Sequence, residues 1–264
     1  MLFPDLETYS DLDIRKVSLD RYASHPSTRI LMCAYAFDEG PVQLWQEGEP
    51  VDELQAAIAA NVCCPWNKGF EENLLRKVWK LEAKAWEDAM ILALYAGLPA
   101  GLKVCNKVPF FAGEAQTSKE SLLINKFCKP SKSGVVHNRD TDPEDWALFC
   151  QYCKDDVHDT RLIWQWLVKR FQMPERVHRA WLLDQRINRR GMPIDRLLTY
   201  RAQEEAVRLQ AEGVEKMKQV TGLENPNSPA QLLKWVSERG YPYDGLGKEL
   251  VKKALEDEGT NVND

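Results

Sequence analysis

The chain of 264 residues lacks the features that mark several specialised classes of protein. No apolar run approaches the ~20 residues of a membrane span. The N-terminus has no basic stretch followed by an apolar one, so no signal peptide is expected. Positive charge is not in excess, since the formal net charge is −5 at pH 7, which argues against binding through bulk positive charge. Without repeats or low-complexity tracts, the chain is expected to be an ordinary globular protein with a sizeable core.

Cysteine and histidine form no metal-site pattern. Seven cysteines, an odd number without a secretion signal, predict reduced thiols. Cys150 and Cys153 have the spacing of half a zinc site, but no second pair with matching spacing follows, which disfavours zinc. The four histidines are equally scattered.

The first two thirds of the chain alternate between strand and helix patterns. Strands are expected at residues 1–8, 28–37, 42–46 and 62–66, with Pro4 at a strand start or a sheet edge. Helices are expected at residues 51–60, from 67 onward, and at 86–95, 119–127 and 142–171. After residue 173 only helices are expected, at 175–190, 195–219 and 230–239. This order predicts an α/β domain over residues 1–172 and a helical segment over 173–264.

Two carboxylates with one residue between them stand near the N-terminus, in Asp5-Leu6-Glu7-Thr8. Side chains alternate along a β-strand, so Asp5 and Glu7 point to the same face. A buried pair of negative charges needs compensation, and a divalent cation supplies it. A solvated strand end has the same pattern, so the pair alone is weak evidence.

Asn67 is expected to open a helix after a buried strand, and Glu71 follows one turn later. An asparagine N-cap and a glutamate near the positive end of the helix dipole account for both residues without any site.

Tyr152 and Asp156 are four residues apart on the long predicted helix, so they stack on one face. A tyrosine beside a carboxylate can hold a water molecule. Neighbouring helix residues differ by ~100°, and the spacing from Tyr152 therefore selects Asp156 over Asp155. In isolation, a half-buried tyrosine and a solvated aspartate also explain the pair.

In chain order, the strand Asp-x-Glu, the Asn-x-x-Phe-Glu at a helix start and the helical Tyr-x-x-x-Asp resemble the three motifs of the DEDD 3′–5′ exonucleases. The tyrosine matches the tyrosine subclass, since the histidine subclass has His where Gln151 stands. Residues 22–28, 123–130 and 152–157 are similar to the proofreading domain of phage-type family A DNA polymerases. Residues 191–195 and 225–233 resemble the helical segment that follows that domain and leads toward the polymerase thumb.

The resemblance implies an α/β fold with an RNase H-like mixed β-sheet flanked by helices, followed by a small all-α segment. It also implies two-metal phosphodiester hydrolysis with two Mg²⁺ or Mn²⁺ ions. Asp5, Glu7 and Asp156 would bind the ion that generates the nucleophile. Asp5 would also bind the second ion, helped by Glu71, and Tyr152 would orient the attacking water. At residue 71 the family commonly has aspartate, and the glutamate here reaches about 1 Å further.

The same resemblance implies contacts with the substrate. Thr8 and Asn67 would contact the terminal nucleotide. Leu12 is a candidate wedge against the last base, with core packing as the alternative. Lys126 and Lys129 begin a basic loop that could contact single-stranded DNA or could be merely solvated.

The function implied is a 3′–5′ exonuclease that removes nucleoside monophosphates from single-stranded or frayed DNA 3′ ends. Its partner would be a DNA polymerase domain, in cis or in trans, with no membrane involved, in the cytoplasm of a phage-infected bacterium. No polymerase half is expected in this chain, because no room is left after Asp264. Two alternatives stay open: a catalytically weak scaffold or single-strand-binding domain of a polymerase, which the departure at Glu71 favours, and an RNA-trimming exonuclease of the same subclass.

Overall fold

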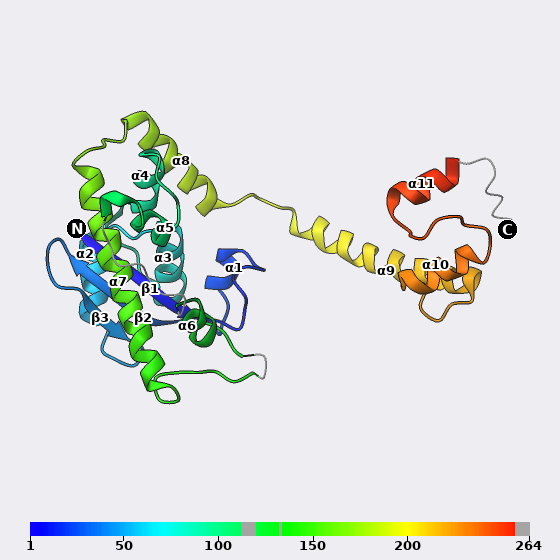
Figure 1. The fold of residues 1–264 in the computed structure, drawn as a ribbon, viewed down its shortest axis with the longest axis horizontal. Coiled ribbons are helices and arrows are strands. Elements are labelled where there is room, and N and C mark those ends of the chain that lie inside the picture. Colours follow the sequence, from blue (N-terminus) through cyan, green and yellow to red (C-terminus); the bar gives the residue numbers. More distant parts are fainter. Residues whose placement is uncertain (112–119, 132–133, 257–264) are drawn as a thin grey trace. The chain divides into compact units, whose positions relative to one another are not determined.

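The computed structural model describes residues 1–111, 120–131 and 134–256 (Figure 1). The chain divides into two compact units, Met1–Leu182 and Leu183–Asp264. The sequence suggested a change at residue 172, ten residues earlier. The first unit extends further because the beginning of helix α8 (Glu175–Arg190) packs within it: Trp181 is buried and stacks on His178, with the Lys68 ammonium 5.6 Å from its ring centroid.

A mixed five-stranded sheet forms the centre of the Met1–Leu182 unit. Its strands are β1 (Leu2–Tyr9), β2 (Arg29–Phe37), β3 (Gln43–Gln46), β4 (Val62–Cys63) and β5 (Ala85–Trp86), in the order β3-β2-β1-β4-β5. The first three are antiparallel, and β4 and β5 run parallel to β1. This α/β arrangement confirms the expected RNase H-like mixed sheet. Strand β5 lies where the sequence predicted the start of a helix, which begins instead at Ala89.

Pro4 lies inside β1, the middle strand of the sheet, and not at an edge as predicted. Pro4 pairs in register with Tyr35 of β2 on one side. On the other side, β4 is only two residues long and pairs with β1 at Leu2. Beyond Leu2, β1 has no paired strand on this side among the described residues, so no interstrand hydrogen bond is lost where Pro4 lacks an N–H, and the proline is tolerated.

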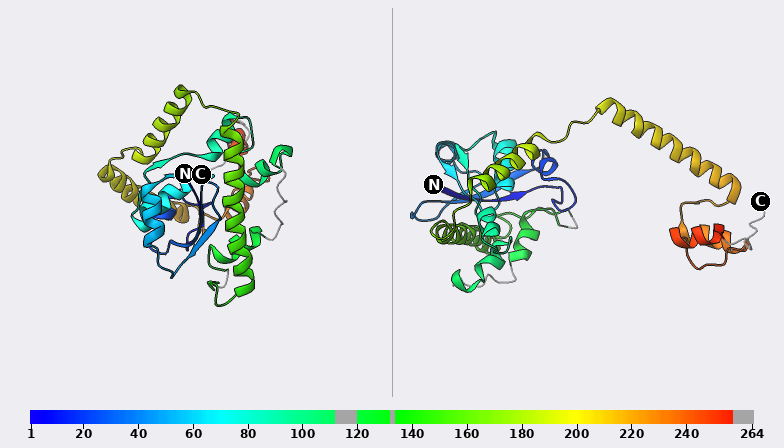
Figure 2. Two further views of the ribbon diagram at one scale, coloured as in Figure 1. Left: turned by 90° about the vertical axis from the view of Figure 1, so that its left-hand side faces the viewer. Right: turned by 90° about the horizontal axis from the view of Figure 1, so that it is seen from above.

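Helices cover both faces of the sheet. On one face, α6 (Glu120–Phe127) and α7 (Pro143–Val168) pack through Phe127, Phe149 and Tyr152. On the other face lie α1 (Leu19–Ala23), α2 (Asp52–Ala60) and α3 (Lys68–Leu74), the last continuing as a π-helical turn, Leu75–Trp79. Figure 2 shows α7 in green on one side of the blue strands and the cyan helices on the other.

A β-bulge interrupts the pairing of β1 with β2. Glu7 pairs with Met32 and Thr8 pairs with Ile30, so Leu31 is an extra residue in β2. Leu31 and Met32 consequently both pack on the α7 side of the sheet, while Ile30 packs on the α3 side. Bulges of this kind are common next to active sites.

The second half of α7 supports a separate apolar cluster. Helices α4 (Ala89–Tyr95) and α5 (Leu102–Asn106) and the 3₁₀ turn Pro109–Phe111 pack there against Ile163 and Leu167. The sequence indicated no regular structure between residues 99 and 119, so α5 was not predicted.

The Leu183–Asp264 unit contains α9 (Arg196–Thr221), α10 (Pro229–Ser237) and α11 (Lys248–Glu256), the last not predicted. Asp195 caps α9 by accepting from Leu198 N–H at 3.0 Å, and Gly222 ends it with φ 68°. Where residues are described, this unit contains no strand, in agreement with the sequence. None of the described helices of the chain is both long and apolar enough to cross a membrane.

Candidate functional site

Asp5 and Glu7 share a face of β1, as their spacing predicts. Their partners in β2 are Ala34 and Met32, which pack on the side of the sheet that α7 covers. Glu7 stands at the bulge, where the strand pairing shifts by one residue. Both carboxylates therefore project from the centre of the sheet toward α7.

Helix α7 brings Tyr152 and Asp156 to the same place. Both side chains are buried, with exposed fractions of 9% and 7%. They are joined by a hydrogen bond, and Asp156 interacts electrostatically with Asp5 and Glu7. The Tyr152 ring stacks on Phe149 at a centroid distance of 6.2 Å, which fixes its plane. The residues of the first and third motifs thus meet, although about 150 positions of sequence separate them.

Glu71 comes from the first turn of α3 and is 4% exposed. Its Oε2 atom is buried without a hydrogen-bond partner among the described residues. An unpartnered buried carboxylate oxygen is costly. This oxygen is therefore suited to bind a cation, or a water molecule that is bound to a cation.

The four carboxylates disfavour one another's charge. Burial, followed by the charge of Asp156, raises the pKa of Asp5 to about 8. Burial and the charges of Asp5 and Asp156 raise the pKa of Glu7 well above its usual value. The pKa of Glu71 is raised well above its usual value by burial and by Asp5. A divalent cation would reverse these preferences by stabilising the ionised carboxylates.

The carboxylates are neighbours, but as they stand they do not surround a position where a metal ion could bind. Over the described parts of the chain, no three His, Cys, Asp or Glu side chains stand in an arrangement that by itself could hold a metal ion. Oxygen donors from two strand positions and two helices suit Mg²⁺ or Mn²⁺, which favour carboxylates over thiolates. They would have to converge further to bind one.

Two thiols contact the carboxylates, and the sequence did not indicate either role. Cys153 Sγ lies 3.4 Å from Asp5 Oδ2 and 3.7 Å from the Asp5 carbonyl oxygen. Cys128 Sγ lies 3.7 Å from Glu7 Oε2. The thiols donate to the carboxylates and hold their orientation. Cys128 also accepts a backbone hydrogen bond from Ser10 N–H at 3.2 Å, which ties the segment after α6 to the end of β1.

Lys103 is a further residue that sequence reasoning missed. It lies on α5, and its Nζ is 4.6 Å from the centroid of the Tyr152 ring. Its charge opposes the rise in the pKa of Glu7. The surrounding sequence has no helical periodicity, so nothing in it pointed to this position.

The residues predicted to contact substrate are only partly brought together. Leu12 and Lys129 line one cavity of ≈ 270 Å³, together with Tyr22 and Cys128. Leu12 also packs against the apolar cluster on the α3 side of the sheet, which is the core packing expected as the alternative to its role as a wedge. The cavity meets the carboxylates through Cys128, which contacts Glu7.

Thr8 and Asn67 are placed differently from each other. Thr8 is buried on the α3 side of the sheet, where its hydroxyl forms a 2.9 Å hydrogen bond with the Tyr22 hydroxyl. Asn67 stands at the N-cap position of α3, as predicted, but its side chain makes no capping hydrogen bond and is exposed. The Asn67 amide therefore remains accessible to a ligand.

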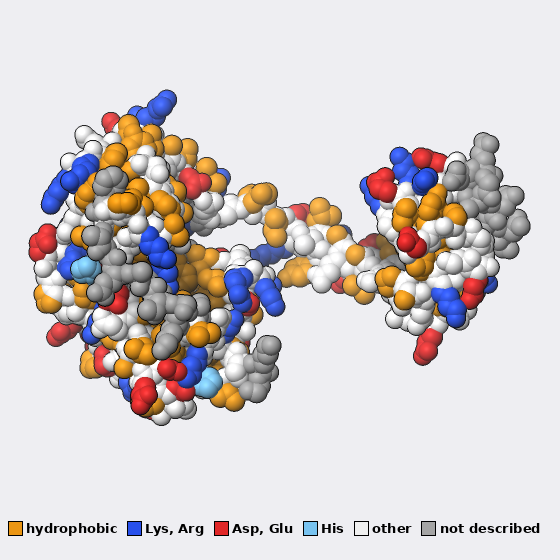
Figure 3. Space-filling view, viewed as in Figure 1, with side chains coloured by type: hydrophobic (Ala, Val, Ile, Leu, Met, Phe, Trp, Pro, Cys, Tyr) orange, Lys and Arg blue, Asp and Glu red, His pale blue; other side chains and the backbone are white. Residues whose placement is uncertain are grey.

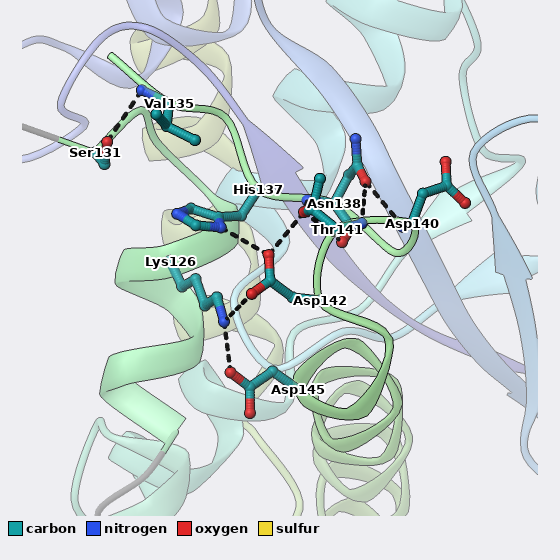
Figure 4. Close-up of polar contacts among 9 residues, drawn as sticks. All are labelled: Lys126, Ser131, Val135, His137, Asn138, Asp140, Thr141, Asp142 and Asp145. Atoms are coloured by element: carbon teal, nitrogen blue, oxygen red, sulfur yellow. Dashed lines mark hydrogen bonds and ion pairs between the residues drawn. The ribbon is translucent and has the colours of Figure 1, made fainter. Parts of the chain in front are cut away.

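Lys126 is engaged in ion pairs. Its Nζ lies 2.5 Å from Asp142 Oδ1 and 2.6 Å from Asp145 Oδ2, and Asp142 also bonds to His137 (Figure 4). These contacts join the end of α6 to the beginning of α7. Lys126 thus has a structural role, and Lys129 is the better candidate of the two for contact with a nucleic acid.

A second cavity, of ≈ 450 Å³, lies between α4, the end of α7 and the beginning of α8. Trp164, Phe171 and Trp181 give it aromatic walls, and Asp88 lines it. None of the residues predicted to form the site lines this cavity.

Basic side chains form no continuous surface on the visible face of either unit. Figure 3 shows Lys and Arg interspersed with Asp and Glu over the described atoms of that face. This agrees with the net charge of −5. Any contact with phosphates would therefore depend on a few placed cations.

The chain is similar along nearly its whole length to a known polymerase. It is 33% identical to a DNA polymerase of Bacillus phage SP02 over 272 aligned positions, which cover 98% of this chain and 41% of the polymerase. The chain thus spans about two fifths of the length of that relative, and it is related to a DNA polymerase. No family model matches it.

Proposed function

We propose that this protein is a metal-dependent 3′–5′ exonuclease that removes nucleoside monophosphates from the 3′ ends of DNA. The observation that carries the proposal is the meeting of Asp5 and Glu7 of β1 with the buried Asp156 of α7, whose charge raises the pKa of both Asp5 and Glu7. Similarity to a phage DNA polymerase supports DNA as the substrate and proofreading as the role, with a polymerase domain as the partner.

In this proposal Asp5, Glu7 and Asp156 would hold the first of two divalent cations, Mg²⁺ or Mn²⁺. Asp5 would also help to hold the second, with Glu71 acting through water. When bound, the cations would activate the attacking water and stabilise the leaving 3′ oxygen. The protein's own groups position the reactants around them.

Tyr152 orients the attacking water through its hydroxyl. The hydroxyl remains protonated, because burial and the neighbouring carboxylates raise its pKa well above the usual value. Its hydrogen bond with Asp156 and its stacking on Phe149 restrict the ring. A fixed phenol beside the carboxylates suits orientation of a water and not proton abstraction.

The terminal nucleotide would occupy the cavity lined by Leu12 and Lys129. Leu12 would contact the base and Lys129 a phosphate, with the Asn67 amide available from α3. An unpaired end is favoured, because separating a terminal base pair costs a few kcal/mol.

The test is cleavage of 5′-labelled single-stranded DNA in Mg²⁺ by the wild-type protein and by Asp156→Asn. The wild type should shorten the strand stepwise, and Asp156→Asn should lower the rate by about 100-fold or more. Asp155→Asn is the matched control: Asp155 is adjacent but bonds to Gln151, and its replacement should leave the rate unchanged.

The same assay separates the two alternatives. An intact strand after incubation with folded wild-type protein and Mg²⁺ would reject the exonuclease and leave a scaffold or single-strand-binding domain. Faster degradation of a matched RNA than of the DNA would favour the RNA-trimming enzyme. EDTA should stop any cleavage that depends on a cation.

A further inference from the structure

Helix α5 is fixed against α7 beside the carboxylates. Cys105 is fully buried in the apolar cluster that α4, α5 and α7 share. Asn106 Nδ2 donates to Asp159 Oδ2 at 2.5 Å, and both residues are buried. Asp159 follows Asp156 by three positions on α7, so this hydrogen bond sets α5 close to the third motif.

This placement brings a positive charge to the site. Lys103 stands two and three positions before the two anchoring residues, and its Nζ lies 4.6 Å from the centroid of the Tyr152 ring. Lys103 is half-buried, and its charge acts on Glu7. The ammonium thus lies beside the ring of the proposed water-orienting tyrosine, and its charge acts on one proposed metal ligand.

We propose that Lys103 is a catalytic residue whose ammonium binds a non-bridging oxygen of the phosphodiester being cleaved. The inference rests on the proposed exonuclease function. In hydrolysis the water oxygen forms a new bond to phosphorus, and the bond from phosphorus to the 3′ oxygen breaks. One proton of the water ends on the 3′ oxygen, and a nucleoside 5′-monophosphate leaves. Lys103 stays protonated throughout and stabilises the charge on the non-bridging oxygen.

The chemistry of the site favours this role for Lys103. Charge on the phosphate changes during attack, and a placed ammonium in a partly desolvated site stabilises it more than solvent does. A charge-assisted hydrogen bond to phosphate is stronger than a cation–π contact, so the contact with the Tyr152 ring does not prevent the ammonium from binding a phosphate. The charges of Asp5, Glu7 and Asp156 repel an anionic substrate, and a nearby ammonium opposes that repulsion.

The experiment compares Lys103→Ala and Lys103→Arg with the wild type under saturating Mg²⁺. Lys103→Ala should lower kcat/KM by about 10- to 100-fold, and Lys103→Arg should recover part of the loss. Lys107→Ala is the matched control, because Lys107 ends the same helix and is exposed. Its kcat/KM should equal that of the wild type.

A second substrate tests whether the lost contact is to the phosphate. In a strand whose terminal linkage is a methylphosphonate, one charged non-bridging oxygen is replaced by a methyl group. The loss caused by Lys103→Ala should then shrink to under about 3-fold, because the two changes remove the same interaction. An equal loss on both strands, or wild-type activity of Lys103→Ala, would overturn the inference. A wild type that cleaves neither strand would instead reject the proposed function.

Discussion

Asp5 and Glu7 each receive a contact from a cysteine thiol, an arrangement that ties the carboxylates to α7 and to the end of α6. Cys153 follows Tyr152 on α7, and Cys128 follows the last residue of α6. Neighbours that orient metal ligands commonly affect metal affinity by 10- to 100-fold. Under the proposed function, the thiol contacts would therefore affect the affinity for the metal.

Replacing Cys153 by alanine should raise the Mg²⁺ concentration for half-maximal cleavage by about 10-fold, since Asp5 loses a donor. Cys153→Ser keeps a donor of similar size and should stay near the wild type. The measurement is a Mg²⁺ titration of the cleavage rate. Cys63→Ala is the control, because Cys63 is equally buried but lies in the apolar cluster on the α3 side of the sheet. A wild-type titration curve for Cys153→Ala would assign the thiol to packing alone.

The sequence indicated the carboxylates but not the groups around them. Asp5 and Glu7 share a face by strand alternation, and Tyr152 and Asp156 share one by helical spacing, so local rules predicted each pair. Cys128 and Cys153 contact residues 121 and 148 positions away. Such contacts depend on how α6 and α7 pack on β1, which local patterns do not specify. The roles assigned to these carboxylates stay predictions.

Asp88 joins two helices at their beginnings. Its Oδ1 accepts from Ile91 N–H and caps α4, and its Oδ2 accepts from Lys68 N–H at the start of α3, both at 3.1 Å. Burial raises the pKa of Asp88 to about 6, although these hydrogen bonds oppose the rise. The start of α3, which positions Glu71, therefore depends on a titratable group.

Asp88 should make the protein less stable as the pH rises from about 4 to about 6. A carboxyl group whose pKa is raised on folding favours the folded state when protonated, and this contribution is lost as the pH rises through the folded pKa. The loss is at most about 3 kcal/mol, since one pKa unit corresponds to about 1.4 kcal/mol. The measurement is urea unfolding at several pH values in EDTA. The difference between the wild type and Asp88→Asn should vary over this range, and a constant difference would contradict the prediction.

Element length decides how much of the fold the sequence could predict. The long strand β2 and the long helix α7 show several periods of their patterns and were predicted. Strand β5 has two residues, too few to show the alternation of a strand, and α5 has five, fewer than two helical turns. Their positions are set by packing on β4 and α7, so the helix that carries Lys103 could not be found from the sequence.

The first unit ends after Trp181, which has a consequence for its stability in isolation. Trp181 is 8% exposed and stacks on His178 at 5.5 Å. A chain of residues 1–172 lacks this tryptophan, whereas a chain of residues 1–182 keeps it.

The free energy of unfolding of the 1–182 chain should exceed that of the 1–172 chain by about 3 kcal/mol, because losing a buried tryptophan lowers stability by at least about that amount. Chemical denaturation followed by circular dichroism gives both values. Trp235→Phe in the full chain is a control for general effects of tryptophan loss, since Trp235 lies on α10 of the other unit. Equal stabilities of the two shortened chains would place the boundary at 172.

The extra residue Leu31 changes which side of the sheet each later residue of β2 faces. Residues of β2 after the bulge face the sides opposite to those that strict alternation from Ile30 would give them. Deleting Leu31 would restore regular pairing and keep the faces of Met32 and Cys33, because Met32 would still pair with Glu7 and Ile30 with Thr8, whereas deleting Ala34 would shift the neighbouring part of β2 by one residue and exchange its faces. Deletion of Leu31 should therefore be tolerated far better than deletion of Ala34, which would disturb the part of β2 that pairs with Asp5 and Glu7.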